Sequence, residues 1–408
     1  MFLTTEIDTC LSLPTLGRDP LGTQAVWQHR ARDVVPYLTG ASHLPEGFQI
    51  LWTALAWWPE FARRFQRRAN EQIRFFLLFE QAVARSCRLA GHPWRLPGSR
   101  RLAAGDPGVW VGLDPARHLL LGNQLGNGTW GIYRGPLINA GLLDGGNHLP
   151  AGLARDVREA TWHPALDKLW TRLDQALGAG AQDTTMVASQ RHRGIVPFLV
   201  ALVTDIPCRD AIDLHLVRGA SRLSALLADV AVRQAQWLDP HDLVKCAGQL
   251  QDQELQDALA RQQACERYLA CLDACFEALC HEAGKTPAQA AQNLAVDMAA
   301  LREAQQAFRT ASGRYDALAR ERHRQMCDAR LDSPQAFAQW LLSHHAMLSA
   351  SRHAAPWLEV REDGRLHCQF AVDRPGAEAL DPARAWRNGY YLGTLAALAR
   401  HLSAGAAA

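Results

Sequence analysis

The sequence predicts a mainly α protein, and three observations lead to this class. Segments with hydrophobic residues at helical spacing occupy much of the chain, whereas the alternation typical of strands is confined to short stretches. Two long polar and alanine-rich segments, 250–282 and 287–330, are separated by the helix-breaking run AGKTP. At 408 residues and 48% hydrophobic content, the chain can bury a core in each of two or three domains.

The first long helix is expected in the segment WPEFARRFQRRANEQIRFFLLFEQAVARSCRLAG, which we predict to be continuous as far as Gly91. Its aromatic and aliphatic residues recur near helical spacing and form a core face. Basic residues line another face: Arg63, Arg64, Arg67, Arg68 and Arg74. From Arg63 to Arg101, ten arginines stand against only two acidic residues, Glu71 and Glu80. This excess makes these five arginines, with Arg100 and Arg101, candidate nucleic-acid-binding residues.

A winged-helix-like module is predicted at 106–177. A short helix, YRGPLINAG, is followed by short extended pieces on either side of the turn Asp144-Gly145-Gly146 and by another helix from Pro150. A winged helix-turn-helix usually ends with these elements in this order: a helix, a tight two-stranded ribbon and a further helix. In the expected recognition helix, Arg134 and Asn139 are the candidate base or phosphate contacts.

The segment 287–330 carries a heptad pattern. Apolar residues fall at seven-residue intervals, with small or apolar residues at the companion position: Leu294, Leu301, Phe308 and Tyr315, then Ala304, Ala311 and Leu318. Such a seam predicts a long helical hairpin or a short coiled coil. It makes Leu301, Phe308 and Tyr315 candidate partner-binding residues.

The C-terminal region is expected to form a small α/β cap. The segment PWLEVREDGRLHCQFAV alternates apolar and polar residues around Asp363-Gly364, which predicts a β-hairpin, and a final helix should follow at about 383–403. The sequence thus divides into an Arg-rich helical part (1–105), the winged-helix-like module (106–177), a helical domain (178–333) and the cap (334–408).

The glycine spacing of Gly126-x-Gly128-x-x-Gly131 matches the sequence motif of dinucleotide-binding proteins. That motif needs a strand before the first glycine and a helix opening at the last, so that phosphate meets the helix N-terminus. Here Trp130 would crowd the phosphate and Pro136 interrupts the following chain. We therefore predict that the glycines shape a turn, and we expect no cofactor.

The cysteines and histidines do not form an obvious catalytic or metal site. Of the cluster Cys265, Cys271, Cys275, Cys280 and His281, only Cys271 and Cys275 share a helix face, which favours buried thiols over zinc. His344, His345 and His401 have apolar neighbours and no carboxylate at useful spacing. No Walker A, HExxH or GxSxG motif is present. We expect no catalytic residues and no metal. The residue pattern favours a non-catalytic protein over an enzyme.

The charge distribution is more informative than the total. The net charge is only +2, but 40 of the 43 basic residues are arginines. Arginine presents a planar fork suited to phosphate and carboxylate. The arginine face could bind phosphates, bind an acidic protein, or be a solvated face balanced by acids elsewhere. The N-terminus lacks the basic residues of a secretory signal and the apolar runs are short, so a cytoplasmic protein without a membrane association is expected.

Several short motifs together resemble an uncharacterised bacterial family. They are GRDPLGTQ, DVVPYLTG, RFFLLFE, GTWGIYRGPLINAGLL, HLPAGLARDV and HHAMLSASRHAAPWLEVREDGRLH, spread over most of the chain. Members of that family typically begin with an Asp-Pro-Leu-Gly element and carry a winged-helix-like segment. The resemblance implies a place in an anti-phage defence island, beside helicases, nucleases or modification genes.

These observations together predict a non-catalytic, DNA-associated subunit of a bacterial defence system that positions a helicase or nuclease. One alternative is a structural or sensor subunit that binds only protein, alone or as part of an oligomer. Another is an enzyme, either a nuclease with an unrecognised site or a nucleotide-binding protein that uses Gly126–Gly131.

Overall fold

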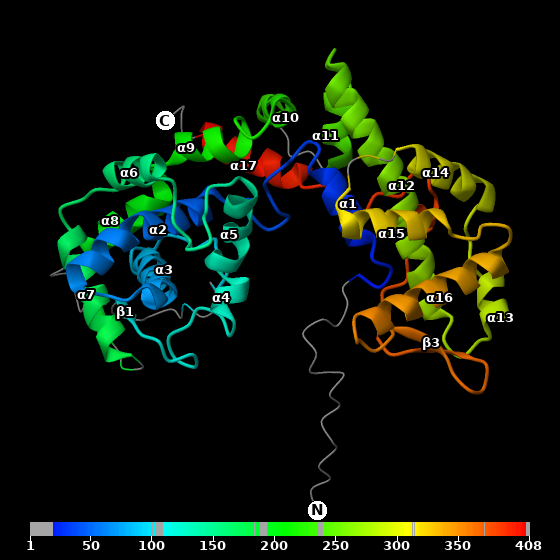
Figure 1. The fold of residues 1–408 in the computed structure, drawn as a ribbon, viewed down its shortest axis with the longest axis horizontal. Helices are drawn as coiled ribbons and strands as arrows, with labels where there is room; N and C mark the ends of the chain where they lie inside the picture. Colours follow the sequence, from blue (N-terminus) through cyan, green and yellow to red (C-terminus); the bar gives the residue numbers. More distant parts are fainter. Residues whose placement is uncertain are drawn as a thin grey trace, which may run out of the picture. The chain divides into compact units, whose positions relative to one another are not determined.

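The computed structural model describes residues 19–98, 102, 109–180, 182, 184–187, 194–234, 240–311, 313, 315–370 and 372–404. It is 62% helix and 3% strand, which confirms the mainly α class. The chain forms two compact units, unit 1 (Met1–Val34 and Pro240–Tyr390) and unit 2 (Val35–Asp239 and Tyr391–Ala408), whose elements are labelled in Figure 1. The sequence-based boundaries, by contrast, lie at 105/106, 177/178 and 333/334.

Unit 2 is built around one apolar helix, α2, against which α3, α5, α6 and α8 pack. Aromatic rings fill its core; Phe61 lies 4.5 Å from Phe75, and Trp57 lies 5.3 Å from Phe79, between ring centroids. Two short strands pair antiparallel, Val111 opposite Thr184. The elements of this unit are α2 (Pro45–Phe65), η1 (Ala69–Glu71), α3 (Gln72–Leu89), β1 (Val109–Val111), α4 (Gln124–Asn127), α5 (Thr129–Asn139), α6 (Ala151–Ala160), α7 (Leu166–Ala179), β2 (Thr184–Val187), α8 (Ile195–Thr204), α9 (Arg209–Ile212), the π-helical turn η4 (Asp213–Val217), α10 (Arg222–Arg233) and α17 (Leu392–Ala404).

The helix predicted to be continuous up to Gly91 is in fact two helices, so that prediction was wrong. Gln66 has a left-handed backbone, φ 56°, and ends α2. The backbone N–H of Arg68 then donates to the Glu71 carboxylate at 2.8 Å, which starts the next helical turn. The reversal places α3 against α2, so the apolar pattern is satisfied across a turn rather than along one helix.

The ribbon expected between Leu143 and Leu149 is also absent, and a turn takes its place. The Asp144 carboxylate accepts hydrogen bonds from the backbone N–H groups of Gly146 and His148, both at 2.8 Å. Because the side chain satisfies these donors locally, the segment folds as a tight turn and forms no strand ladder. Helices α5 and α6 flank it as predicted, without a wing.

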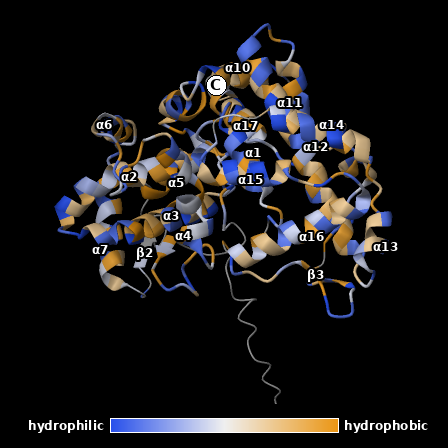
Figure 2. Cartoon of the chain, turned by 45° about the vertical axis from the view of Figure 1, so that its right-hand side comes forward, coloured by the Kyte–Doolittle hydropathy of each residue, from blue (hydrophilic) through white to orange (hydrophobic). Residues whose placement is uncertain are grey.

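Unit 1 is built around the long helix α12, against which α1, α14, α16 and η5 pack. The predicted helix at 250–282 is confirmed by α12. In the β-hairpin, Leu358 lies opposite Cys368 and Val360 opposite Leu366, and Figure 2 shows its turn as hydrophilic. The elements of this unit are α1 (Thr23–Ala31), α11 (Pro240–Ala247), α12 (Gln253–His281), α13 (Pro287–Gln292), α14 (Met298–Thr310), α15 (Ala317–Cys327), α16 (Pro334–Ser351), β3 (Leu358–Val360), β4 (Leu366–Cys368) and η5 (Ala377–Leu380).

The segment 287–330 is three helices and not the single helix that we predicted. Asp297 starts α14 by accepting from the N–H of Ala299 at 2.8 Å, and Asp316 starts α15 by accepting from Ala319 at 2.7 Å. Each aspartate is an N-cap, which favours a new helix over continuation of the old one.

The final helix begins later than the sequence pattern suggested. Residues 381–384 form a turn in which the Asp381 carboxylate accepts from the N–H of Ala383 at 2.9 Å. The helix α17 starts only at Leu392 and belongs to unit 2, whereas the β-hairpin belongs to unit 1. No helix in the described part of the chain is long and apolar enough to cross a membrane.

Candidate nucleic-acid interface

Four of the predicted arginines are exposed near the connection between α2 and α3, and three of them, all but Arg64, have no ion pair with a described residue. Arg63 lies on the last turn of α2, Arg68 follows that helix, and Arg74 lies on the first turn of α3. Within the described residues, no carboxylate forms an ion pair with any of the three. These guanidinium groups are therefore available to an external anion.

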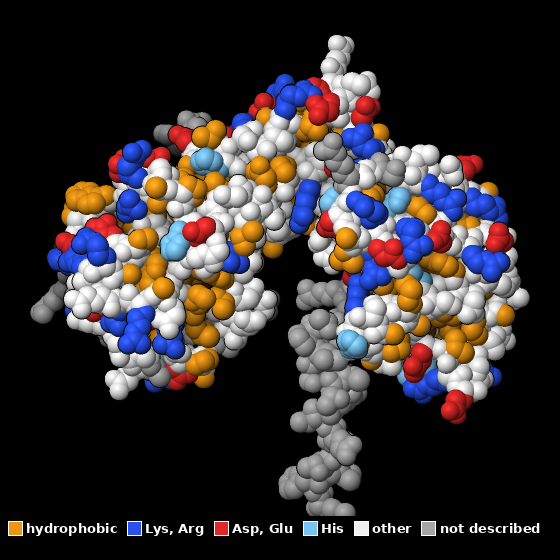
Figure 3. Space-filling view, in the orientation of Figure 1, with side chains coloured by type: hydrophobic (Ala, Val, Ile, Leu, Met, Phe, Trp, Pro, Cys, Tyr) orange, Lys and Arg blue, Asp and Glu red, His pale blue; other side chains and the backbone are white. Residues whose placement is uncertain are grey.

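Two neighbouring arginines serve the fold instead. The Arg67 Nε lies 2.7 Å from an Asp174 carboxylate oxygen on α7, and another guanidinium nitrogen of Arg67 donates to the Asp174 carbonyl at 2.9 Å. Arg64 pairs with Asp167, also on α7. Figure 3 shows basic and acidic side chains next to one another over the end of α2. The arginine face of the sequence is thus partly a set of links between α2 and α7.

A shallow pocket of about 160 Å³ lies beside Arg64. The buried rings of Trp57 and Trp170 line it, together with Arg158 and Trp162. Trp162 is 69% exposed, the highest value among the large hydrophobic residues that the structure describes. Sequence reasoning missed Trp162. The available signal was a tryptophan in the short loop Thr161-Trp162-His163-Pro164, outside any apolar periodicity.

The other predicted contact residues are held within unit 2 or lie outside the described residues. The Arg134 Nε donates to the Asn147 side-chain oxygen at 2.7 Å, and the Asn139 amide donates to the Tyr37 carbonyl at 3.1 Å. Arg100 and Arg101 lie outside the described residues. Arg134 and Asn139 are therefore engaged in hydrogen bonds within unit 2, whereas Arg63, Arg68 and Arg74 form no ion pair with a described residue.

The glycine pattern forms a close junction between α4 and α5. A Cβ atom on Gly131 would overlap the carbonyl oxygen of Gly126. The buried Glu80 carboxylate accepts from the backbone N–H of Thr129 at 3.0 Å, at the N-terminus of α5, and from the Gln124 amide. Burial raises the pKa of Glu80. A protein carboxyl group thus occupies the helix N-terminus where a pyrophosphate would bind.

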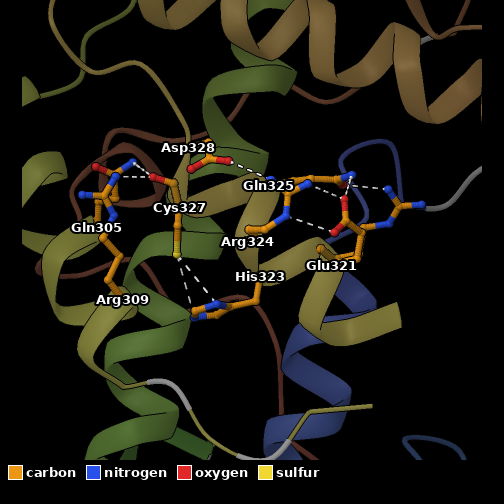
Figure 4. A network of polar contacts seen from close by, with 9 residues as sticks. Gln305, Arg309, Glu321, His323, Arg324, Gln325, Cys327 and Asp328 are labelled. Carbon is orange, nitrogen blue, oxygen red and sulfur yellow. Dashed lines mark hydrogen bonds and ion pairs between the residues drawn. The ribbon is translucent and has the colours of Figure 1, made fainter. Parts of the chain in front are cut away.

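Figure 4 shows a histidine and a cysteine in contact on α15, a pair that no sequence motif indicated. The Cys327 Sγ lies 3.7 Å from Nδ1 of His323. Burial lowers the pKa of His323 and raises the pKa of Cys327, so the thiol and the neutral imidazole are favoured. Nucleophilic cysteines need the thiolate. Gln305 and Arg309 on α14 both donate to the Cys327 carbonyl, so the network joins α14 to α15.

Two further histidines and four cysteines are engaged or buried within unit 1. On α16, His344 Nε2 and His345 Nδ1 each lie 2.9 Å from a backbone carbonyl oxygen, of Leu21 and Pro20 respectively. The cluster Cys265, Cys271, Cys275 and Cys280 is buried and its thiols are unbridged. Within the described residues, no three His, Cys, Asp or Glu side chains come together in a way that could hold a metal ion.

Six of the seven heptad residues are buried inside unit 1, and Leu318 is exposed. Leu301 and Phe308 are at most 1% exposed, and the Phe308 ring centroid lies 5.0 Å from that of Tyr268 on α12. Tyr315 accepts a hydrogen bond from Arg30 at 2.8 Å through its hydroxyl oxygen. The seam is filled by residues of its own unit, so it does not offer a surface to a partner while the unit is folded.

The chain matches no protein-family model, and no curated protein or solved structure is significantly similar to it.

Proposed function

We propose that this protein is a non-catalytic, nucleic-acid-associated subunit that binds the phosphate backbone through unit 2. The observation that supports this proposal is the set of three exposed arginines without ion-pair partners in the described residues, Arg63, Arg68 and Arg74. We call these residues, with Trp162, the basic surface. Arginines on a solvated surface bind successive phosphates without reading sequence.

The exposed tryptophan favours a single strand over a duplex. Trp162 presents most of its ring to solvent beside a pocket that contains Arg64 and Arg158. Proteins that bind single strands combine a positively charged track with aromatic rings on which bases stack. Arg64 is paired with Asp167 only at the surface, and an exposed ion pair is weak enough for a phosphate to replace the carboxylate.

The recognition helix of a winged-helix module is a less suitable contact surface. Arg134 and Asn139 on α5 are engaged within the unit, and a turn stands where the wing was expected. We therefore place the nucleic-acid contact on the basic surface. The defence context, in which the protein would position a helicase or nuclease, is a proposal supported by the motif resemblance alone.

The test is fluorescence anisotropy with the full chain and labelled oligonucleotides of mixed sequence, single-stranded and double-stranded, at low salt. The wild type should bind both forms and bind the single strand more tightly. Trp162→Ala should weaken single-strand binding about tenfold, since one stacked base contributes about 1–3 kcal/mol. The same variant should leave duplex binding nearly unchanged.

A matched control replaces exposed arginines of unit 1. Arg330 and Arg361 have side chains 72% and 55% exposed, so Arg330→Glu with Arg361→Glu changes the net charge equally to Arg63→Glu with Arg74→Glu. Only the unit 2 pair should lose affinity. Absence of binding to either oligonucleotide, or an equal loss in both double variants, would overturn the proposal and leave the protein-binding alternative.

A further inference from the structure

Unit 1 contains a polar pocket of about 210 Å³ that none of the features above explains. Its lining includes Asp273 from α12, a residue only 8% exposed, and two further carboxylates, Asp19 and Glu277. The rings of Trp27 and Trp357 line it as well. We call it the carboxylate pocket.

Among the carboxylates of this pocket, Asp273 has too few hydrogen-bond donors. The Thr23 hydroxyl oxygen lies 3.0 Å from Oδ2 of Asp273 and 3.2 Å from Oδ1 of Asp19. A hydroxyl has one proton, so it donates to one of the two at a time. The Oδ1 of Asp273 is buried and has no hydrogen-bond partner among the described residues. A buried carboxylate oxygen in this state is unfavourable unless another donor approaches.

The charges around Asp273 leave it without a cation of its own. Arg387 lines the pocket, but its guanidinium lies 2.7 Å from Glu277 and pairs with it. Asp19 pairs with Arg352 at 3.4 Å, and Arg352 is outside the lining. The described lining residues thus carry three carboxylates and one guanidinium, which favours a positively charged ligand.

We propose that the carboxylate pocket binds a small organic monocation, an ammonium or amidinium group joined to a flat apolar body. The charged group pairs with Asp273, and the apolar body lies against Trp27 and Trp357. Tryptophan rings present a large apolar surface against which a flat ring can pack. A cavity of about 150 Å³ holds one benzene ring, so this pocket has room for a ligand with a single ring.

Other ligand classes fit the pocket less well. An anion would face three carboxylates, and the single lining guanidinium is already paired with Glu277. A metal ion would need several convergent ligands, and the described residues hold no group of three that could bind one. An organic cation instead uses both the negative charge and the aromatic rings.

One buried histidine holds two parts of the pocket lining in place. His345 Nδ1 donates to the Pro20 carbonyl at 2.9 Å, and its Nε2 accepts from the backbone N–H of Trp357 at 2.8 Å. Burial lowers the pKa of His345, which favours the neutral ring that both bonds require. A pocket fixed before binding loses less conformational freedom when its ligand arrives.

The environment of Asp273 also makes binding depend on pH. Burial raises the pKa of Asp273 to about 8, with Arg387 lowering it and the charges of Asp19 and Glu277 raising it. Burial lowers the pKa of His345, on the neighbouring α16, and so favours its neutral form. A monocation pairs with the ionised carboxylate, so binding below pH 8 releases a proton and affinity should increase about tenfold per pH unit.

The test is calorimetric titration of the full chain with benzylammonium chloride at pH 6, 7 and 8, with benzyl alcohol as the neutral analogue. The cation should bind saturably, more tightly as the pH rises, with close to one proton released at pH 6 in buffers of different ionisation enthalpy. Benzyl alcohol should bind much more weakly and without pH dependence. Comparable binding of the two probes, or no saturable binding of the cation, would overturn the proposal.

Variants separate the two parts of the pocket. Asp273→Asn keeps the acceptor for Thr23, removes the charge, and should lower affinity at pH 8 at least tenfold and abolish the pH dependence. Trp357→Ala should lower affinity and keep the pH dependence. Asp328→Asn, at an exposed residue that directly follows α15, is the control and should change neither. If Asp273→Asn does not fold, the proton release of the wild type alone decides, and a value near zero contradicts the proposal.

Discussion

The basic surface of unit 2 and the carboxylate pocket of unit 1 carry charge in opposite ways. Arg63, Arg68 and Arg74 keep their charge in water, where it costs the fold little. Asp273 is buried and lacks a cation of its own. Its carboxyl group is therefore either protonated or paired with a bound cationic ligand. An exposed unpaired charge therefore suits a loose, sequence-independent contact, whereas a buried one suits a small and specific ligand.

The largest loss of stability should come from a mutation in the buried heptad seam of unit 1, which contains neither an exposed nor a buried unpaired charge. Phe308→Asp places a carboxylate between Tyr268 and the His323 ring, and should destabilise unit 1 by more than about 4 kcal/mol. Chemical denaturation followed by circular dichroism measures it. The control Leu318→Asp alters a residue 57% exposed and should stay within about 0.5 kcal/mol. Equal behaviour of the two variants would refute the buried seam.

The next effect concerns the sign of the pH dependence in unit 1. The pKa of Asp273 is about 8 in the folded chain, above its unfolded value of about 3.9, so the folded state binds more protons between these pH values. The free energy of unfolding therefore falls as pH rises through this window, by at most about 4 kcal/mol at pH 7. Asp273→Asn should raise stability at pH 7–8 and change it little at pH 4. A variant less stable than wild type at pH 8 would contradict the buried, unpaired carboxylate.

A smaller effect is expected at the glycine junction of unit 2. Gly131→Ala forces a Cβ onto the Gly126 carbonyl and should destabilise the unit by about 1–3 kcal/mol. Gly135→Ala is the matched control on the same helix, with open space around the new Cβ, and should stabilise by about 0.5–1 kcal/mol.

Neither NAD nor ATP should raise the melting temperature of the wild type; a saturable shift would restore the nucleotide-binding alternative.

The smallest effect distinguishes the structural arginines from the free ones. Arg67→Glu breaks the hydrogen bonds to Asp174 and should destabilise unit 2 by about 1–2 kcal/mol, whereas Arg63→Glu should stay within about 0.5 kcal/mol. Thermal melting of the two single variants measures the difference. If Arg63→Glu is the more destabilising change, Arg63 belongs to the fold and not to the basic surface.

Local signals in the sequence predicted part of this fold well. The α12 helix was located because the AGKTP run stops it, and the β-hairpin because apolar residues alternate around Asp363-Gly364. The breaks at Gln66 and before Asp316 were missed because the apolar spacing continues across them. The N-capping residues Asp297 and Asp316 are visible in the sequence, but the prediction for 287–330 used only the heptad spacing.

The candidate sites were harder to predict because they depend on pairs distant in the sequence. The arginine face was visible, but the acids that engage Arg64 and Arg67 lie about 100 residues away on α7. The exposure of Trp162 and the burial of Asp273 are properties of the folded chain. The carboxylate pocket joins residues from the start of α1, from α12, from just before β3 and from the segment after η5, and no local pattern connects these four.

The most direct test of the central claim, that the unpaired arginines of unit 2 contact phosphates, is the salt dependence of single-strand binding. For the wild type, the logarithm of the affinity should fall linearly with the logarithm of salt concentration, by about 0.7 per phosphate contacted. Arg63→Glu with Arg74→Glu should reduce this slope by about 1.4, while Arg330→Glu with Arg361→Glu leaves it unchanged. An unaltered slope in the unit 2 double variant would contradict the account.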